Sequence, residues 1–475
     1  MAASTGEIDI HSDFASTFAA FSSSLSVEGL APDVIAAVKA DLFDTLACAT
    51  AGYSGEGVSN LVGMISDWGG KPEATIWCAG VRVPAHHAAW ANGMMSHARD
   101  FDDTHDAAVL HAGVSVVPAA IAAAESRPGV TGGDLLAGIT VGLELICRLG
   151  LATKVGIIES GYMYTSLFGH FAATAAVARV LRLSHEQTIN ALGVAYSQAA
   201  GTHQVTRDAA LTKRVQPGFA AKTGLISAGM TLAGIRGAQR TFEGVDGLFR
   251  SYFKGAYDPD RLRDGLGQRF ELCKLSFKPY PCCRFNHTAI DAALQLRPQL
   301  GGDVQIRRIT AHVTRQSHEA VGTPIEMRRR PQTVVQAQFS IPYTVACALR
   351  RGEVTLADFT AEGIQDASVR EIAALVDVVT DAEIEREWSR SMSPTRLYVE
   401  TDQGSFEARV DYPRGHFASP MSSEDFDRKM LGCLAVSGLA WPDETVAKLR
   451  AAIDGLDGEA DVQSIIGAMT GAAKR

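Results

Sequence analysis

The sequence predicts a mainly α-helical protein in which a large all-helical domain carries a smaller α+β lid domain. Apolar residues recur at three- and four-residue steps through most of residues 32–267, which is typical of packed helices. Alternating apolar and polar residues, typical of strands, are concentrated between about residues 300 and 413. We therefore expect residues 1–273 and 414–475 to form the helical domain and residues 274–413 to form the lid.

The helical domain is expected to open with a long helix that starts near Pro32. Apolar residues recur at helical spacing from Val34 to Ala49, and Gly52 stands where this helix should end. Further along the chain, Ser184 and Gln187 have the spacing of a capping box, in which each side chain accepts from the backbone N–H of the other. The abundance of small residues between these points predicts closely packed helices.

The expected lid mixes strands and helices. Residues 309–314 alternate between apolar and polar, and residues 402–404 separate two further alternating segments, which predicts a hairpin. Helices are expected between these strands, over residues 336–350 and 369–376. Beyond residue 413 the pattern is helical again, and we expect one apolar face formed by Phe426, Met430, Leu431 and Leu434.

The composition excludes several classes of protein. The chain has 475 residues, of which 46% are hydrophobic and 20% charged, a balance that supplies a large core and excludes disorder over most of the length. A formal net charge of -9 argues against partners such as nucleic acid or an anionic membrane. The apolar stretch from Leu135 to Thr153 contains Glu144 and Arg148, which favours a buried helix over a membrane span.

Targeting and redox patterns are also missing from the sequence. Its start, MAASTGEIDIHSDF, lacks the basic and apolar regions of a secretory signal. The 8 cysteines are scattered and form no CxxC pair, which argues against a disulfide framework and against a cysteine-rich zinc site. We therefore expect a soluble, cytoplasmic protein.

The densest group of chemically active side chains lies between His97 and Asp106. This stretch reads HARDFDDTHD, and His111 follows shortly after it. Carboxylates beside imidazoles shift one another's pKa and can serve as general acid–base pairs. Two other interpretations stay open, namely helix capping within a solvated acidic loop and a metal site. No HxxxH or HExxH spacing accompanies these residues, which argues against the metal interpretation without excluding it.

Two cationic segments could bind an anionic substrate. Lys213 and Arg214 precede the Pro217-Gly218 pair, which marks an expected helix start whose backbone N–H groups would add to their charge. Lys278 opens a proline-spaced loop, KPYPCCRFNH, that leads into another helix. Taken singly, each segment also fits surface charge at a domain junction, and the adjacent thiols of the second fit packed side chains. The sequence contains no glycine-rich phosphate loop, nucleophile elbow or dinucleotide fingerprint.

Four segments together resemble the signatures of the MmgE/PrpD family. They are residues 96–105, 212–218, 277–283 and the FSIPY stretch at 339–343, and they occur in the family's order. The family contains 2-methylcitrate dehydratases, cis-aconitate decarboxylases and iminodisuccinate epimerases. The resemblance implies an all-helical domain with an α+β lid, a homodimer, and chemistry that needs no metal or organic cofactor.

Carried over residue by residue, the resemblance implies a set of site residues. Catalytic or substrate-contacting roles fall on Asp100, Thr104, His111, Lys213, Lys278 and Tyr343. Arg214, Arg284 and Cys283 are further candidates for substrate binding. In the expected mechanism the two lysines hold carboxylates, and His111, oriented by Asp100, moves the proton. Tyr343 or Thr104 would then position the leaving group or a developing enolate.

The chain also departs from the family pattern. Met163 stands in the stretch GYMYTSLFG where many members have a histidine, and Gln216 replaces another frequent histidine. Cys283 occupies a position where some decarboxylases have a histidine. His170 could substitute for a missing imidazole, although a packed histidine near a helix start is the simpler interpretation.

These observations predict a cofactor-independent lyase that dehydrates or decarboxylates a small di- or tricarboxylate. The main alternative is an epimerase or isomerase of an imino- or amino-dicarboxylate such as iminodisuccinate, because it would use the same proton transfer without elimination. A binding protein that has kept the site but lost catalysis is the alternative from another class. The presence of all four ionisable residues, Asp100, His111, Lys213 and Lys278, favours an enzyme.

Overall fold

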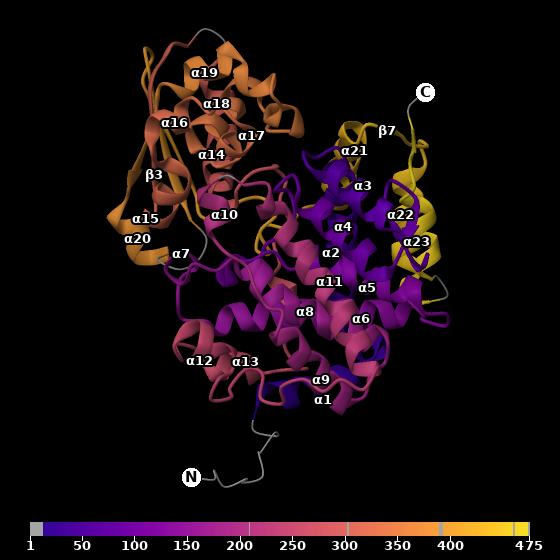
Figure 1. The fold of residues 1–475 in the computed structure, drawn as a ribbon. Coiled ribbons are helices and arrows are strands. Elements are labelled where there is room, and N and C mark those ends of the chain that lie inside the picture. Colours follow the sequence, from indigo (N-terminus) through magenta and orange to yellow (C-terminus); the bar gives the residue numbers. More distant parts are fainter. Residues whose placement is uncertain (1–12, 209, 302–303, 389–392, 459–460, 474–475) are drawn as a thin grey trace. The chain divides into compact units, whose positions relative to one another are not determined.

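The computed structural model divides the chain into two compact units (Figure 1). It describes residues 13–208, 210–301, 304–388, 393–458 and 461–473. The first unit takes the described residues of Met1–Ala98, Ala108–Leu275 and Ser437–Arg475, and the second takes those of Arg99–Ala107 and Ser276–Val436. These units differ from the expected domains because residues 99–107 and 414–436 belong to the second unit. The segment 1–12, where no secretory signal is expected, lies outside the described residues.

The first unit is built from long helices, as predicted. Helix α8 packs against α5, α6 and α11, and α4 packs against α2 and α11. Their interiors are rich in Ala, Val and Leu side chains that are fully buried. Their bounds are α2 Pro32–Tyr53, α4 Ala85–His97, α5 Gly113–Ser126, α6 Gly132–Ala152, α8 Tyr164–Val180, α9 His185–Tyr196 and α11 Thr212–Leu232.

The sequence predicted that helix α2 ends at Gly52. In the structure Gly52 instead lies within the last turn of this helix. A Cβ atom at Gly52 would lie 1.9 Å from the carbonyl oxygen of Met95 on α4. The glycine therefore permits close packing of two helices, and α2 continues to Tyr53. The capping box of α9 is confirmed, because Ser184 Oγ accepts from the backbone N–H of Gln187 and Gln187 Oε1 accepts from that of Ser184.

Helix α11 also begins earlier than the sequence predicted. It starts at Thr212, so Lys213 lies in its first turn and Pro217 lies inside the helix. A proline there has no N–H to donate to the carbonyl of Lys213, but the helix continues past it. A Cβ atom at Gly218 would lie 2.3 Å from the carbonyl oxygen of Trp90, so this glycine permits the contact between α11 and α4.

One described helix, α6, is long and apolar enough to cross a membrane by length and composition. Its most apolar window is 94% buried inside the structure, which identifies α6 as a core helix. The two charges that interrupt its sequence pair with each other, with Arg148 Nε 2.6 Å from Glu144 Oε1. Arg148 also donates to the carbonyl oxygens of Leu262, Asp264 and Arg269, so its charge is well solvated by the protein.

The second unit contains a four-stranded sheet in the order β4-β3-β5-β6. Strand β3 (Ile306–Val313) pairs in parallel with β4 (Val376–Thr380) and antiparallel with β5 (Thr395–Thr401). Strand β5 pairs antiparallel with β6 (Ser405–Val410), which confirms the predicted hairpin. Helix α14 (His287–Leu300) packs against β5, β6 and α18 (Ile341–Arg351), and these elements share the unit's core.

Several elements of the second unit correct the sequence-based expectations. A helix was predicted over residues 369–376. The observed helix, α19, covers Ala367–Ala373, and residues 376–380 form strand β4. The predicted helix over 336–350 is broken into α17 (Val334–Gln338) and α18, because Ser340 caps a new start by accepting from the backbone N–H of Tyr343. On α21 (Ser423–Val436), Leu431 is 56% exposed and does not join the buried face of Met430 and Leu434.

Short strands also form in the first unit, where none was expected. β1 (Ala74–Ile76) pairs with β2 (Val81–Val83), and β7 (Leu439–Ala440) pairs with β8 (Ala472–Ala473). Each pair has only two or three residues in register, which is too short to give a clear alternation in the sequence.

Candidate active site

The acidic loop at residues 99–107 is held within the second unit by a buried ion pair between Asp100 and Lys278. Lys278 Nζ donates to Asp100 Oδ1 at 2.8 Å and to the Asp100 carbonyl oxygen at 2.9 Å. Lys278 is 0% exposed and Asp100 is 5% exposed. The backbone φ of Asp100 is +52°, a left-handed conformation that is uncommon outside glycine and occurs often at functional sites.

The charge of Lys278 is stabilised by its carboxylate neighbours. Burial alone would lower the pKa of Lys278, but the negative charges of Asp100 and Asp102 and the hydrogen bond to Asp100 outweigh it and raise the pKa above its usual value. Lys278 therefore stays protonated at any physiological pH, although much of its charge is already compensated inside the second unit.

A second buried ion pair lies at the other end of the same loop. Arg284 Nε lies 3.2 Å from Asp106 Oδ1, and Ser276 Oγ donates to Asp106 Oδ2 at 2.5 Å. Burial acts to raise the pKa of Asp106, but the charge of Arg284 and the hydrogen bond from Ser276 lower it below its usual value. Nearby, burial lowers the pKa of His416 to about 4, with Asp106 partly opposing this effect.

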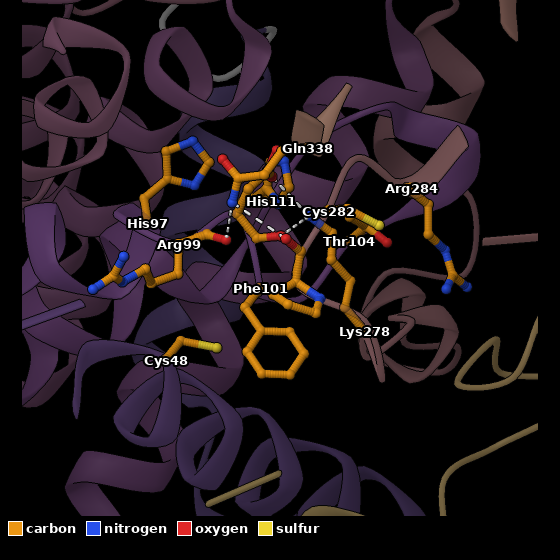
Figure 2. Close-up of polar contacts among 12 residues, drawn as sticks. Cys48, His97, Arg99, Phe101, Thr104, His111, Lys278, Cys282, Arg284 and Gln338 are labelled. Atoms are coloured by element: carbon orange, nitrogen blue, oxygen red, sulfur yellow. Dashed lines mark hydrogen bonds and ion pairs between the residues drawn. The ribbon is translucent and has the colours of Figure 1, made fainter. Parts of the chain in front are cut away.

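Backbone contacts complete the anchoring of the acidic loop. Thr104 and Ser276 exchange backbone hydrogen bonds of 2.8 and 2.7 Å, and Thr104 Oγ1 donates to Asp106 Oδ1. Gln338 Nε2 donates to the Arg99 carbonyl oxygen at 2.7 Å (Figure 2). The Thr104 hydroxyl is thus engaged within the loop, and no sequence spacing linked Ser276 or Gln338 to it.

Lys429 on α21 is another residue that sequence reasoning missed. Its Nζ donates to the Phe101 carbonyl oxygen at 2.7 Å and lies 4.0 Å from the centroid of the Phe101 ring. The only available signal was the lysine's place beside Met430 on a predicted helix, which does not indicate a partner more than 300 residues away.

The adjacent cysteines differ in exposure. Cys282 is fully buried, and burial raises the pKa of its thiol, although a hydrogen bond from Asn286 acts in the opposite direction. Cys283 is half-buried, and its backbone N–H donates to the Gln338 carbonyl oxygen at 2.9 Å. Cys282 is therefore a packed thiol, and only Cys283 remains a candidate for contact with substrate.

Tyr343 does not lie with the ionisable candidates of its unit. Its side chain is 0% exposed within the core around α18, and its hydroxyl donates to the Asp358 carbonyl oxygen at 2.6 Å. Burial raises the pKa of this phenol, as do Cys347 and Asp358. The geometry gives Tyr343 a packing role, and we therefore leave it out of the mechanism that the sequence predicted for it.

In the first unit, three helices bring a lysine and two histidines together. Lys213, in the first turn of α11, has its Nζ 3.1 Å from Nε2 of His97, the last residue of α4. The rings of His97 and His111 lie edge to face, with centroids 4.9 Å apart. The backbone N–H of His111 donates to Thr165 Oγ1, at the start of α8. His111 and Lys213 therefore belong to one cluster, and His97 joins it.

Lys213 Nζ and His97 Nε2 form a hydrogen bond of 3.1 Å, in which the donor and the acceptor depend on the tautomer of His97. His97 is 1% exposed, whereas His111 and Lys213 are half-buried. The arrangement presents a cation and an imidazole side by side, which suits carboxylate binding and proton transfer.

Arg214 and His170 are used inside the first unit. Arg214 Nη1 donates to the Glu56 carbonyl oxygen at 3.2 Å, and the side chain is 9% exposed. His170 is 4% exposed in the middle of α8, with Nδ1 2.9 Å from Thr223 Oγ1. Burial lowers the pKa of His170 to about 4, so the packed interpretation fits it and it does not replace the imidazole missing at Met163.

The first-unit side chains that a metal ion could use are His97 and His111. Zinc accepts imidazole nitrogens, usually with three or four protein ligands in all. His97 Nε2 already faces the Lys213 ammonium group, which a metal ion would have to displace. Within the first unit, His97 and His111 alone supply fewer ligands than a zinc site usually has.

Each unit thus contains charged and imidazole side chains of the kind that can carry acid–base chemistry. The chain matches the MmgE/PrpD N-terminal domain over residues 16–260 and the MmgE/PrpD C-terminal domain over residues 280–454. It belongs to the MmgE/PrpD family, and the resemblance seen in its motifs is confirmed.

The chain is similar along nearly its whole length to named enzymes. It is 27% identical over 461 residues to the cis-aconitate decarboxylase-like protein oryM of Aspergillus oryzae, covering 92% of this chain and 93% of that protein. It is 28% identical to the cis-aconitate decarboxylase of Homo sapiens, covering 87% and 86%. With the 2-methylcitrate dehydratase of Escherichia coli it shares 26% identity, covering 79% and 80%. The chain is accordingly an enzyme of the lyase type.

Proposed function

We propose that this enzyme removes CO2 from a small tricarboxylate that resembles cis-aconitate. The cluster of Lys213, His97 and His111 in the first unit carries this proposal, because it pairs a cation with a proton-transfer group. The names of the relatives that match 85–94% of the chain support decarboxylation over other lyase reactions. No organic cofactor or metal takes part in the reaction we propose.

Each step of this reaction has a residue of the cluster to perform it. Lys213 binds a substrate carboxylate and stabilises the negative charge that develops next to it. The carbon–carbon bond to the leaving carboxylate breaks, CO2 departs, and the electron pair stays on the substrate as a conjugated carbanion. His111 then gives a proton to carbon and regains one from solvent. His97 accepts the Lys213 hydrogen bond and keeps the ammonium group oriented.

The second-unit candidates have a supporting role in this proposal. The Asp100–Lys278 pair keeps the acidic loop in its left-handed conformation, and Lys278 supplies positive charge that matters most when extra negative charge develops. Thr104, Arg284 and Cys283, with Arg214 of the first unit, remain substrate-binding candidates. The observed contacts of Thr104 and Arg284 favour an indirect role through Asp106.

Dehydration is the second candidate reaction. The relatives named 2-methylcitrate dehydratase match 79% of the chain, and the same acid–base pair could remove water from a hydroxy-tricarboxylate. In that case His111 would take a proton from carbon and the hydroxyl group would leave.

A turnover assay with cis-aconitate and 2-methylcitrate in parallel tests the proposal. CO2 release from cis-aconitate with formation of one product supports decarboxylation, and alkene absorbance from 2-methylcitrate without CO2 supports dehydration. Deuterium incorporation from heavy water into an imino-dicarboxylate, with no net elimination, would instead support the epimerase alternative and overturn the lyase proposal.

We propose further that the enzyme acts as a cytoplasmic homodimer, as the family resemblance implies. Sedimentation equilibrium of the purified chain tests the assembly, because the monomer has a mass of 50.5 kDa. A single species near this mass at working concentration would contradict the dimer.

A further inference from the structure

The segment at residues 200–207, which ends in the short helix α10 (Gln204–Arg207), lies directly beside the start of helix α8 in the first unit. Gly201 has a φ of +151°, and its carbonyl oxygen accepts from the backbone N–H of Met163. Ser166 Oγ donates to the carbonyl oxygen of Ala200 at 2.9 Å. A Cβ atom at Gly201 would lie 2.7 Å from Ser166 Cβ, so only glycine lets the loop pack this closely.

These contacts fix the position of His203. Its backbone N–H donates to the Gly161 carbonyl oxygen at 2.9 Å, and the preceding Thr202 pairs with Tyr162 in a short antiparallel bridge. The Thr202 carbonyl oxygen accepts from Gln216 Nε2 on α11 at 3.1 Å. His203 is therefore placed between the start of α8 and the first turns of α11, the helix that carries Lys213.

The side chain of His203 has an unused hydrogen-bonding nitrogen. His203 is half-buried, and its Nδ1 is buried with no hydrogen-bond partner among the residues that the structure describes. Unsatisfied buried nitrogens are rare in native proteins and need an explanation, such as a ligand that completes the set. Burial, followed by the positive charges of Arg207 and Lys213, lowers the pKa of His203 below its usual value.

An anionic ligand would account both for the unbonded Nδ1 of His203 and for the positive charges near this side chain. A carboxylate accepts hydrogen bonds from an imidazole N–H and from an ammonium group. Arg207 and Lys213 are near enough for their positive charges to act on His203, and the same charges would favour an anion at this nitrogen. Two nitrogen donors allow two-point binding of one carboxylate, which a single flexible lysine does not give.

We propose that His203 is a substrate-binding residue that, together with Lys213, holds one carboxylate group of the substrate. This inference rests on the proposed function, because it assumes that Lys213 binds a carboxylate of a tricarboxylate. It adds a residue that the motif-based set lacks, and it assigns to His203 the orientation of the substrate beside His111.

Calorimetric titration with propane-1,2,3-tricarboxylate tests this role without turnover. The probe has three carboxylates but neither a hydroxyl group to eliminate nor a double bond. His203→Phe keeps an aromatic ring and removes both nitrogens, so we expect its Kd for the probe to rise about 10- to 100-fold, the usual contribution of a hydrogen bond to a charged group. His203→Asn keeps an N–H donor near the position of Nδ1 and should stay within about fivefold of the wild type.

Two controls separate binding from folding. Gln204→Ala changes an exposed neighbour whose side-chain amide donates to Asp208, so it should leave the Kd unchanged. Thermal unfolding identifies any variant that fails to fold, and His203→Ala replaces His203→Phe if the larger ring is not accommodated. Whether His203→Phe or His203→Ala is used, we expect its Kd to be clearly higher than that of the wild type and the Kd of His203→Asn to be close to it.

The outcome for His203 is distinct from the outcome for the proposed function. If wild-type protein binds the probe but releases no CO2 from cis-aconitate, the decarboxylase proposal fails and the binding result still decides the role of His203. A Kd for His203→Phe or His203→Ala equal to that of the wild type overturns the inference. An equal loss in His203→Asn also overturns it, since the effect would then not depend on a donated hydrogen bond.

Discussion

Lys213 and Lys278 both stand in cationic segments of the sequence, but their surroundings in the two units are opposite. Lys278 is fully buried and donates twice to Asp100, whose negative charge compensates its own. Lys213 is half-buried, and the nitrogen 3.1 Å from its Nζ belongs to the imidazole of His97. The comparison teaches that the side chains around a lysine, which its motif does not reveal, indicate whether it mainly stabilises the fold or suits the binding of a substrate.

The largest expected effect concerns His111, the proposed proton donor, whose ring lies against that of His97. His111→Ala should lower kcat by about 10²–10⁴-fold, the usual contribution of a positioned acid or base, and should leave substrate binding nearly unchanged. Steady-state kinetics on folded protein measures both quantities. His111→Gln, which keeps a polar side chain of similar length, is the matched control and should be equally slow. A fully active His111→Ala enzyme would move the proton-transfer role to His97.

The next largest effect is on the free energy of unfolding, and it is expected when Lys278 is replaced. Lys278→Met leaves the Asp100 carboxylate buried without its cation and should destabilise the protein by about 3–5 kcal/mol, as breaking buried ion pairs does. The double variant Asp100→Asn/Lys278→Met removes both charges and should recover much of this loss. Urea unfolding followed by circular dichroism measures the free energy of unfolding. Equal stability of Lys278→Met and the wild type would contradict the structural role of the pair.

A smaller effect on stability is expected when the pH is lowered, and it also concerns a residue of the second unit. The pKa of His416 is lowered to about 4 in the folded protein, whereas an unfolded histidine titrates near 6.5. The unfolded chain therefore binds more protons as pH falls from about 6.5 to about 4, and stability should fall over that range. Thermal unfolding at a series of pH values should show a shallower decline in His416→Gln. Identical slopes in the two proteins would remove His416 from this explanation.

The smallest effect is expected from chelators. Because Lys213 faces Nε2 of His97, the histidine cluster suits an anionic ligand better than a metal ion. Activity should be unchanged after dialysis against EDTA, and elemental analysis of the active enzyme checks the same point independently. Loss of activity that zinc or manganese restores would contradict this expectation and would assign a new role to His97 and His111.

The fold could be predicted where a local pattern determines the structure. The capping box at Ser184, the hairpin around residues 402–404 and the helical content of the first unit all follow from short-range signals. The failures occur where tertiary packing decides. Gly52 looks like a helix end in the sequence, but it is needed for contact with Met95, which lies 43 positions away. Strand β4 is half-buried and short, so its period is easily read as helical.

The site could be predicted only in part, for the same reason. Motifs singled out Asp100, His111, Lys213 and Lys278 as candidates, but they did not indicate that Lys278 pairs with Asp100. Neither the donation of Gln338 to the Arg99 carbonyl nor that of Lys429 to the Phe101 carbonyl has a spacing rule, because both contacts join distant segments. Tyr343 shows the opposite error, since its motif is present but its hydroxyl is used by the backbone of the core.

The central claim of our proposal is that Lys213 binds a carboxylate of the substrate, whereas Lys278 mainly stabilises the fold through its ion pair with Asp100. The most direct test is the Kd for propane-1,2,3-tricarboxylate in wild type, in Lys213→Ala and in the double variant Asp100→Asn/Lys278→Met, measured by calorimetry at low and high salt. We predict that Lys213→Ala binds at least about tenfold more weakly and loses most of the salt dependence, whereas the double variant stays within a few fold of wild type. An equal or larger loss in the double variant, with Lys213→Ala unchanged, would contradict the account.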